Sequence, residues 1–425
     1  MESTLRAYSS IKDSDFFRVD YPEHVLKNAK KKNDVDIPSN EPLYWRANTL
    51  TAYNSTLDYR LNDFYVALEN GGAAKRRTSI ISCDNRTRLS YLLGVKYYLL
   101  ESETENDYMG YLNENFELYK KRGDIHIYRS KAEPSLGYVF DSVLDTKAFE
   151  RLSALDKEQA LMDCVVTDEE TGGLKKYEPR SIITELPYKV ESGSQNEVEK
   201  NKIIIGEEKN PMYLLIPEIT DSELFVSFDG LKKGNKDDIY YYISTDAKPK
   251  MVFYRGSNAQ AVENGNRFLT NLGYYQSAKG AISISFKNAG TYEYNNLKVF
   301  QMPKADFEEQ AAELSGQRLR ISEQKANYLK GTVNAKQDGI LFLSLVYNPG
   351  WKVYIDGERQ DTFITDICFT GVRVSAGEHE VVLKYRPVGF HISILMFFTG
   401  IVCIIGIEWY YRKRRISDLK ECKAA

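Results

Sequence analysis

Paired carboxylates are the first residues of this sequence whose spacing could bind a metal ion. Carboxylate oxygens are the ligands that calcium prefers in proteins, so two neighbouring aspartates in a polar stretch form a candidate calcium site. Such pairs are more often solvated loop residues, and we assign no metal ligand. The three pairs are Asp13 with Asp15, Asp34 with Asp36, and Asp237 with Asp238.

Histidines and catalytic motifs identify no further reactive centre. The sequence has no G-x-G-x-x-G, no P-loop and no G-x-S-x-G. The stretch "HEVVL", which begins at His379, lacks the second histidine of a zinc-protease helix. The histidines are scattered without cysteine pairs nearby, so no metal-site spacing results. We therefore predict no catalytic, cofactor-binding or metal-binding residue among the four, His24, His126, His379 and His391.

Three other features have both a functional and a structural interpretation. Trp351 could stack on a sugar ring, but packing in a β-core is the favoured interpretation. Asp356 precedes Gly357 and is better explained as a turn former than as a catalyst. Two stretches fit the N-x-S/T glycosylation sequon at Asn54 and Asn85, and helix capping explains Asn54 adequately.

The composition is that of a globular protein with room for two or three domains in 425 residues. Apolar residues make up 42%, charged residues 28%, and the formal net charge is −3. This charge gives no electrostatic case for a nucleic-acid partner. Thirty-one tyrosines favour half-buried strands over the alternative, sugar-contacting surfaces.

The cysteines form no C-x-x-C pair and are far apart in sequence, so no disulfide framework can be read. We expect free, partly buried thiols. The five are Cys83, Cys164, Cys368, Cys403 and Cys422.

Residues 388–411 are predicted to form a transmembrane helix. Residues 388–407 contain no charged side chain, and twenty helical residues span about 30 Å, the thickness of the hydrocarbon core. Three aromatic residues at 409–411 and four basic residues at 412–415 follow. These flanks argue against a buried soluble helix. Because positive charges stay in the cytoplasm, residues 412–425 are predicted to be a cytoplasmic basic tail and residues 1–387 to lie outside.

The first residues, "MESTLRAYSSIKDSDFF", do not have the pattern of a signal peptide. We therefore expect the chain to be the end of a longer membrane protein, whose earlier spans would deliver the large region outside. The alternative is a tail-anchored protein that faces the cytosol. In either case the membrane lipid bilayer is a partner.

Residues 1–200 mix helix and strand patterns. Residues 54–72 predict a helix capped by Asn54, Ser55 and Thr56. Residues 88–100 predict a short helix, a turn at Gly94 and a buried strand. Residues 155–166 predict a helix with Asp156 and Gln159 at capping-box positions, and residues 166–181 a polar connector.

The rest of the chain before the membrane segment is predominantly β. Residues 201–302 hold short β-branched and aromatic runs between turns, typical of a β-sandwich. Residues 303–319 predict a connecting helix with Phe307, Ala311 and Leu314 on one side. Residues 320–387 predict a second, smaller β-sandwich, with a hairpin that turns at Ala376-Gly377. The predicted fold class is α+β, predominantly β, with one C-terminal transmembrane helix.

A series of segments resembles the C-terminal half of bacterial YfhO-type membrane proteins. Each motif is degenerate, and the order of the segments along nearly the whole chain carries the resemblance. The segments are 15–20 "DFFRVD", 43–65, 92–100 "LLGVKYYLL", 125–142, 149–162 "FERLSALDKEQALM", 343–360 "LSLVYNPGWKVYIDGERQ" and 377–395.

The resemblance implies a multi-spanning glycosyltransferase of the bacterial cell membrane. It would use polyprenyl-phosphate-linked sugars at the outer face to glycosylate cell-surface polymers such as lipoteichoic acid. The family's catalytic aspartate is expected in an early loop between transmembrane helices, as a base toward an acceptor hydroxyl. The multi-spanning part is absent from this sequence, so no catalytic residue is carried over.

Three roles remain open for the chain. It could hold a cell-surface glycopolymer over a catalytic site supplied by the missing N-terminal multi-spanning half. It could be a non-enzymatic, membrane-anchored module that binds a glycan or a partner. It could also be a remnant without function.

Overall fold

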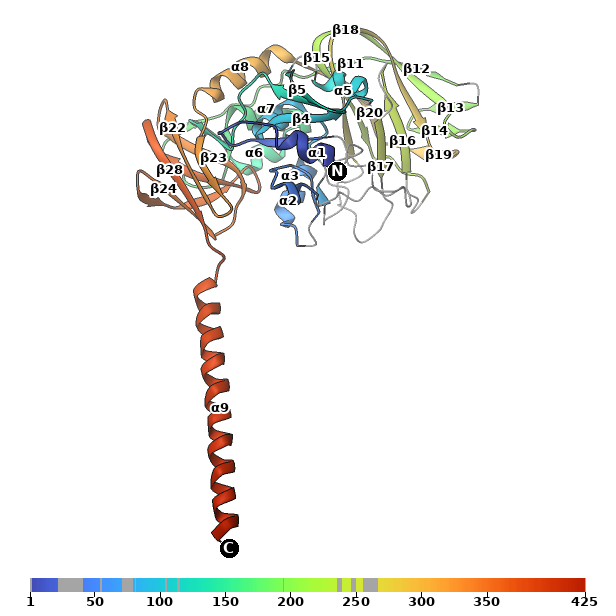
Figure 1. Ribbon diagram of the computed structural model, residues 1–425. Helices are drawn as coiled ribbons and strands as arrows, with labels where there is room; N and C mark the ends of the chain where they lie inside the picture. The colour runs from blue at the N-terminus through green and yellow to red at the C-terminus, as the bar shows by residue number, and fades with distance from the viewer. Residues whose placement is uncertain are drawn as a thin grey trace.

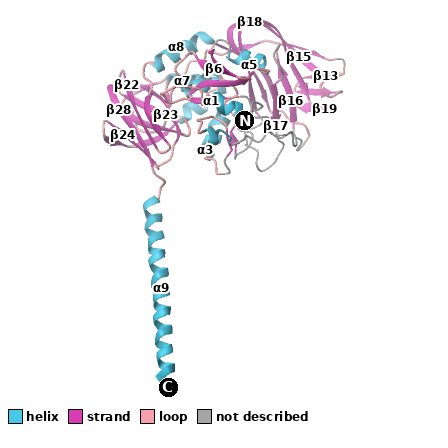
Figure 2. Ribbon diagram, viewed as in Figure 1, coloured by secondary structure: helices cyan, strands magenta, loops and turns pink. Residues whose placement is uncertain are grey.

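The computed structural model describes residues 2–21, 41–53, 56–70, 79–80, 82–103, 105–112, 115–193, 195–234, 239–245, 250–254 and 267–424. Figure 1 shows a head from which the C-terminal helix projects, and Figure 2 shows the shorter helices gathered between two strand-rich ends. The predicted class, α+β and predominantly β with one C-terminal apolar helix, is confirmed.

A four-stranded sheet, ordered β1-β4-β6-β5, forms part of the N-terminal region. Gly94 leads from α4 into β4 with a φ of 76°, and a Cβ there would lie 2.8 Å from the Ser135 carbonyl oxygen, so only glycine fits. This confirms the predicted helix, turn and strand over 88–100. The elements are α1 (Glu2–Tyr8), β1 (Arg18–Asp20), α2 (Glu41–Trp45), β2 (Ala52–Tyr53), α3 (Tyr59–Ala67), β3 (Ser79–Ile80), α4 (Thr87–Leu92), β4 (Val95–Glu101), α5 (Glu105–Leu112), β5 (Phe116–Arg122) and β6 (Ile125–Ser130).

Two capped helices follow in the middle of the chain. In α7, the Asp156 N–H donates to the Ser153 hydroxyl (3.2 Å), so Ser153 is the N-cap. The predicted capping box of Asp156 and Gln159 is therefore wrong by one helical turn: Asp156 is the third residue of a helix that begins earlier. The elements are β7 (Gly137–Phe140), β8 (Ser142–Leu144), α6 (Thr146–Glu150), α7 (Ala154–Asp163), β9 (Val165–Val166) and β10 (Lys175–Lys176).

A large sheet is built around two long antiparallel strands, β15 and β18. Its order is β11-β20-β15-β18-β16-β17, with β12 paired to β15, and a three-stranded sheet β13-β14-β19 accompanies it. Side chains of both sheets share one apolar core. The strands are β11 (Thr184–Leu186), β12 (Lys189–Ser192), β13 (Asn196–Glu199), β14 (Lys202–Ile205), β15 (Pro211–Asp229), β16 (Ile239–Ser244), β17 (Lys250–Tyr254), β18 (Arg267–Phe286), β19 (Gly290–Glu293) and β20 (Asn296–Pro303).

Helix α8 (Lys304–Ser315) connects the large sheet to the C-terminal strands. Phe307, Ala311 and Leu314 are buried on one side of it, as their spacing predicted. They pack in the central core with side chains of α3, α4 and α7. Helix formation here is thus coupled to burial of one apolar face.

Two C-terminal sheets pack against each other. One is ordered β21-β22-β28-β24-β25 and the other β26-β27-β23-β7, so a strand from residues 137–140 completes the second. Apolar side chains from both sheets share one core. The strands are β21 (Arg320–Lys325), β22 (Tyr328–Ala335), β23 (Gly339–Val346), β24 (Trp351–Ile355), β25 (Glu358–Gln360), β26 (Thr362–Thr365), β27 (Phe369–Val374) and β28 (Gly377–Tyr385).

The predicted hairpin at Ala376-Gly377 is wrong. β27 pairs with β23 and β26, whereas β28 pairs with β22 and β24, so the turn carries the chain from one sheet to the other. Val372 and Val374 of β27 and Val381 and Leu383 of β28 are buried, and they meet across the shared core rather than within one sheet. The division into domains at residues 200, 302, 319 and 387 stays a prediction.

A buried polar cluster at the start of α4 holds these parts together. The Arg86 guanidinium donates to the carbonyls of Leu68 and Leu269 (both 2.8 Å) and lies 3.6 Å from the Glu158 carboxylate of α7. The Thr87 hydroxyl donates to Glu223 of β15 (2.5 Å). Because buried charges need such partners, the cluster fixes α4 against both the large sheet and α7.

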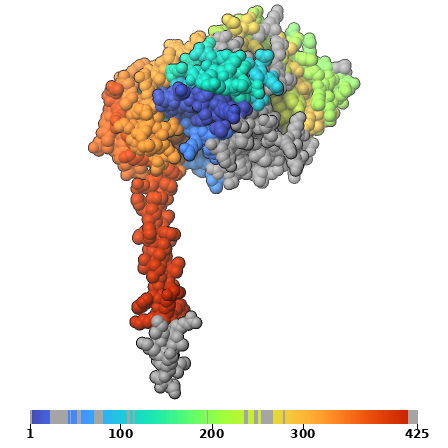
Figure 3. Space-filling view, viewed as in Figure 1, coloured from blue at the N-terminus to red at the C-terminus, as the bar shows by residue number. Residues whose placement is uncertain are grey.

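The last helix, α9 (Phe390–Ala424), stands clear of the head (Figure 3). Its segment Phe390–Lys413 is long and apolar enough to cross a membrane, with a mean hydropathy of 2.3 over its most apolar stretch, and none of that stretch is buried. The predicted span is therefore not a core helix. The helix also continues through the segment predicted as a basic tail, 412–425, as far as Ala424.

Candidate functional site

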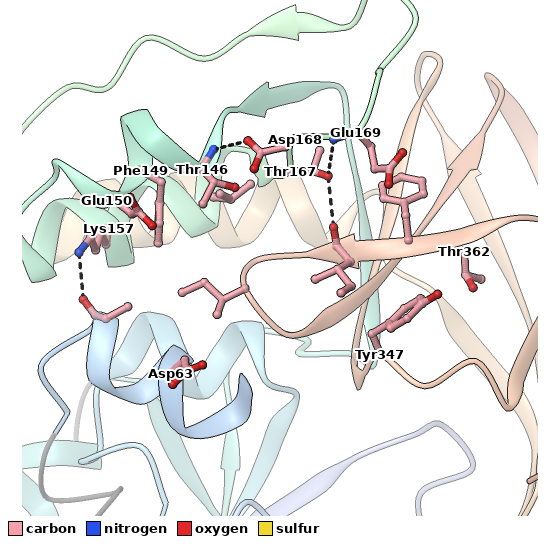
Figure 4. Close-up of a pocket in the computed structure, with 15 residues that line it drawn as sticks. Asp63, Thr146, Phe149, Glu150, Lys157, Thr167, Asp168, Glu169, Tyr347 and Thr362 are labelled. Carbon is pink, nitrogen blue, oxygen red and sulfur yellow. Dashed lines mark hydrogen bonds between the residues drawn. The ribbon is translucent and has the colours of Figure 1, made fainter. Parts of the chain in front are cut away.

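A cleft of about 660 Å³ lies where three distant parts of the chain meet. The first part is α3, the second is α6 and α7 with the segment after β9, and the third is β26 with the loops beside it (Figure 4). The lining residues are Asp63, Ala67, Thr146, Phe149, Glu150, Lys157, Val166, Thr167, Asp168, Glu169, Tyr347, Thr362, Phe363, Ile364 and Ile367.

The α3 wall is set by an aspartate cap and an arginine. Asp58 has an extended backbone and accepts from the Arg60 N–H (3.0 Å), so it begins the helix. The Arg60 guanidinium also donates to the Tyr347 carbonyl (2.9 Å) and lies 5.7 Å from the centre of the Tyr347 ring. Arg60 thus joins α3 to the Tyr347 loop. The predicted cap was Asn54 to Thr56; Asp58 is the cap because the helix begins only at Tyr59, and Asn54 and Ser55 lie outside the described residues.

The second wall is the start of α6. Asp145 caps this helix by accepting from the Ala148 N–H (2.9 Å), and Asp168 accepts from the Thr146 N–H (2.9 Å). Two carboxylates therefore satisfy backbone donors at one helix start, where negative charge is favoured. This places Phe149 and Glu150 at the cleft, where Figure 4 shows them beside Lys157.

The third wall is joined to the second by Asp366. Its Oδ1 accepts from the Val166 N–H (2.7 Å), and its own N–H donates to the Val166 carbonyl (2.8 Å). The Thr167 hydroxyl donates to the Ile364 carbonyl (3.2 Å). Asp366 is fully buried, and burial raises its pKa to about 8. The carboxyl is therefore mostly protonated at neutral pH.

The cleft carries an excess of negative charge. Among the described residues, four carboxylates line it, those of Asp63, Glu150, Asp168 and Glu169, against one ammonium group, that of Lys157. Burial lowers the pKa of Lys157, which donates to the Ala67 carbonyl (3.2 Å). The other described parts of the chain provide no hydrogen bond or ion pair to the carboxylates of Asp63, Glu150 and Glu169.

This lining suits a hydroxyl-rich ligand. Carboxylates accept hydrogen bonds from hydroxyl groups, and the partly exposed rings of Tyr347 and Phe363 provide apolar surface at the same cleft. The excess of carboxylates would repel a phosphate group. Among the described residues, no group of three or more acidic, histidine or cysteine side chains could hold a metal ion.

The acidic pairs proposed from the sequence are not gathered at the cleft. Asp13 contacts Lys96 (2.9 Å), and Asp15 accepts from the Ile321 N–H (2.9 Å), so both make structural contacts. The pairs Asp34 with Asp36 and Asp237 with Asp238, and also His24, lie outside the described residues. The remaining histidines have separate partners: His126 contacts Glu105, His379 contacts Asp356, and His391 contacts Arg386.

The other candidates have structural roles. Trp351 packs at the edge of the C-terminal core and lies 5.1 Å from the ring of Tyr385. Asp356 has a φ of 52° and accepts from the Glu380 N–H (2.8 Å), which confirms it as a turn former. The Asn85 side chain accepts from the Tyr98 hydroxyl (2.6 Å). The thiols of Cys83, Cys164 and Cys368 are free, as expected, but they are fully rather than partly buried, and Cys403 of α9 is free and exposed.

No cleft residue was identified from the sequence as a site residue. The lining comes from positions 63–67, 146–169 and 347–367, and no local motif marks it. The family resemblance did include some of the cleft residues. Glu150 and Lys157 lie in the segment 149–162, and Tyr347 lies in 343–360, which are two of the segments that carry the family resemblance.

Comparison with known proteins assigns the chain to a family. The family model "Bacterial membrane protein YfhO" matches residues 2–397. The protein YfhO of Bacillus subtilis (strain 168) is 22% identical over 440 residues, which cover 99% of this chain and 48% of that protein. The chain thus spans about half the length of the curated relative that it matches.

Similarity to solved structures is weak. A mutant of the arabinofuranosyltransferase AftD from Mycobacteria aligns with a TM-score of 0.19 and 11% identity, over 41% of this chain and 14% of that one. A β-glucuronidase from Bacteroides uniformis aligns with a TM-score of 0.13 and 10% identity, over 42% of this chain and 22% of the other. These scores carry no argument about function.

Proposed function

The chain belongs to the YfhO family of bacterial membrane proteins. We propose that its head is the extracytoplasmic part of a membrane glycosyltransferase. The observation that carries the proposal is the cleft in a head attached to an apolar helix, together with three cleft carboxylates to which the described residues provide no hydrogen bond or ion pair. In Figure 1, α3, which provides Asp63, lies on the side of the head from which α9 departs. A polymer held there would be close to the membrane surface.

The orientation in this proposal follows from charge. Arg412, Lys413, Arg414 and Arg415 lie at the C-terminal end of the apolar segment, and such basic clusters stay cytoplasmic. Residues 1–387 would then be outside and residues 412–425 inside. This orientation suits an enzyme whose acceptor is a polymer of the cell surface.

The proposed reaction transfers a sugar from a polyprenyl-phosphate-linked donor to a hydroxyl group of a polymer such as lipoteichoic acid. The acceptor hydroxyl loses its proton to a base, and its oxygen bonds to the anomeric carbon. The bond from that carbon to the phosphate oxygen breaks, and polyprenyl phosphate leaves. We assign this step to the membrane-spanning half of the family's proteins, which precedes the part that this chain covers. To the cleft we assign binding of uncharged, hydroxyl-bearing sugar units of the acceptor, because its carboxylates would repel the phosphate groups of such a polymer.

Removal of two cleft charges tests this assignment. Asp63→Asn with Glu150→Gln keeps the side-chain size but weakens two hydrogen bonds to hydroxyl groups, so we expect a roughly tenfold or larger rise in the apparent KM for the acceptor polymer. The matched control is Glu358→Gln, an exposed carboxylate of β25. Sugar incorporation in membranes containing the full protein is the readout. An unchanged KM in the double variant would exclude the cleft as the acceptor site.

The same cleft also supports the second candidate, a non-enzymatic glycan-binding module. The two functions differ in whether the sugar donor is consumed. If membranes that contain the chain and its multi-spanning half bind the polymer but release no polyprenyl phosphate from a labelled donor, the binding module is the correct function. If labelled sugar appears on the polymer, the chain is part of a glycosyltransferase.

A further inference from the structure

A basic surface lies where the head meets the apolar helix. β24 and β28 are antiparallel neighbours, and their register places Lys352 directly opposite Lys384 and Trp351 opposite Tyr385. Arg386 follows β28 at once. We call Lys352, Lys384 and Arg386 the basic collar.

The basic collar lacks acidic partners. Like charges directly opposite each other on a sheet destabilise it, yet no carboxylate within the described residues forms an ion pair with any of the three side chains. Lys384 lies instead 5.0 Å from the centre of the Tyr354 ring, and the Lys352 ammonium donates to the Pro349 carbonyl (2.9 Å). Within the described part of the head, no carboxylate therefore neutralises their positive charge.

Strand β28 carries the opposite charge near its other end. It runs from Gly377 to Tyr385, with Glu378 and Glu380 near its start and Lys384 near its end. Glu380 is paired with Lys330 (2.7 Å), so farther along this sheet a lysine does have a carboxylate partner. At the end that leads into the helix, by contrast, no carboxylate of the described residues pairs with Lys352 or Lys384.

This end lies next to the bilayer. Three residues, Pro387, Val388 and Gly389, separate Arg386 from the first helical residue, Phe390. Three extended residues reach about 10 Å, which is close to the Debye length at physiological ionic strength. The basic collar is therefore within electrostatic reach of the lipid headgroups wherever the apolar segment enters the membrane.

Aromatic and polar neighbours complete the surface. Trp351 and Tyr385 lie in tilted contact on the other face of the same strand ends, and aromatic rings of this kind are favoured at membrane interfaces. The Arg386 guanidinium contacts the His391 imidazole (2.6 Å), which joins the basic collar to the first turn of α9.

We propose that the basic collar binds the phosphate groups of anionic phospholipids and so holds the end of the five-stranded sheet against the membrane. Each basic side chain near an anionic surface contributes roughly a fivefold preference. The interaction fixes the distance and tilt of the head relative to the bilayer. It does not depend on the proposed transfer reaction.

Hydrogen exchange of the full chain in nanodiscs tests the proposal. Nanodiscs of phosphatidylcholine are compared with nanodiscs that also contain phosphatidylglycerol, and amide exchange is followed in peptides from 348–354 and 381–389. We expect the anionic lipid to slow exchange in both peptides. Lys352→Gln with Lys384→Gln should reduce this slowing by roughly 25-fold, because each substitution removes a fivefold preference.

A matched control removes two positive charges elsewhere on the C-terminal strands and their loops, by Lys336→Gln with Arg359→Gln. The control variant should keep the lipid-dependent slowing, and high salt should abolish it in both the control and the unmodified chain. Identical exchange in the two kinds of nanodisc, or equal slowing in the collar variant and the unmodified chain, would overturn the proposal. Because the readout is local, lipid binding at the other end of α9 does not affect it.

Discussion

Asp366 and Val166 exchange two hydrogen bonds, one from the Val166 N–H to the Asp366 carboxyl (2.7 Å) and one from the Asp366 N–H to the Val166 carbonyl (2.8 Å). Two hundred residues separate them in sequence. Val166 lines the cleft, and Asp366 lies between the lining residues Ile364 and Ile367. This pair therefore fixes the distance between two walls of the cleft.

Substitutions of Asp366 should show whether its hydrogen bond to Val166 or its charge stabilises the fold. Asp366→Asn keeps the acceptor and tolerates the φ of 47°, and the carboxyl that it replaces is mostly neutral at pH 7. We expect a change in unfolding free energy below about 1 kcal/mol for Asn and a loss of about 2–3 kcal/mol for Ala, which leaves the buried Val166 N–H unpaired. Chemical unfolding followed by tryptophan fluorescence gives both values. Equal losses in the two variants would contradict this role.

The stability of the head should fall as pH rises through the neutral range. Burial raises the pKa of Asp20 to about 6, of Glu158 to about 7 and of Asp366 to about 8. Between the ordinary carboxyl pKa of about 4 and these values, the folded state binds more protons than the unfolded state, so stability decreases with pH. The contribution is fully present below about pH 4 and lost by about pH 8.

Thermal unfolding in nanodiscs from pH 5 to pH 8 measures this dependence. Asp366→Asn should make the fall less steep in the upper part of the range, since Asp366 has the highest pKa of the three. A melting temperature that rises from pH 5 to pH 8 would show that these carboxyls are ionised in the folded state.

Arg86 should be among the most sensitive positions in the head. It is fully buried, and its removal leaves the buried Glu158 carboxylate without its ion-pair partner and two carbonyls without their donor. We expect Arg86→Ala to cost about 3–5 kcal/mol of unfolding free energy. The exposed Arg359→Ala should change it by less than about 0.5 kcal/mol. Similar denaturation midpoints for the two variants would mean that the cluster at α4 does not hold the parts together.

The ring of Tyr347 should contribute to glycan binding. Tyr347→Phe keeps the aromatic face, whereas Tyr347→Ala removes it, along with about 1 kcal/mol of ring contact. Calorimetric titration of the full chain in nanodiscs with a neutral glycan should show a roughly fivefold weaker affinity for Ala only. Equal affinities of the Ala variant and the unmodified chain would exclude Tyr347 from the binding surface.

Local patterns in the sequence predicted the elements whose determinants are local. The spacing of Phe307, Ala311 and Leu314 predicted the buried face of α8, and Gly94 marked the turn between α4 and β4. The uncharged stretch 388–407 predicted the apolar helix. In each case the residues that decide the structure are neighbours in the chain.

Strand pairing and the cleft could not be predicted in this way. The turn at Ala376-Gly377 has the composition of a hairpin turn, but β27 and β28 pair in different sheets because their partners come from elsewhere in the chain. The cleft combines residues from three segments, and Asp366 joins two of them across two hundred positions. Only the folded chain brings these residues together.

The central claim, that the head is outside and the basic end inside, can be tested with a membrane-impermeant maleimide. Cys83, Cys164 and Cys368 are buried, and burial raises the pKa of each thiol, so these three should not react in the folded protein. Cys422 follows the basic cluster, and Ser192→Cys would add an exposed thiol on β12 of the head.

The proposed orientation predicts that the reagent labels Ser192→Cys in intact cells, and that Cys422 reacts only after the membrane is permeabilised. Labelling of Cys422 from outside intact cells, with Ser192→Cys protected, would contradict it.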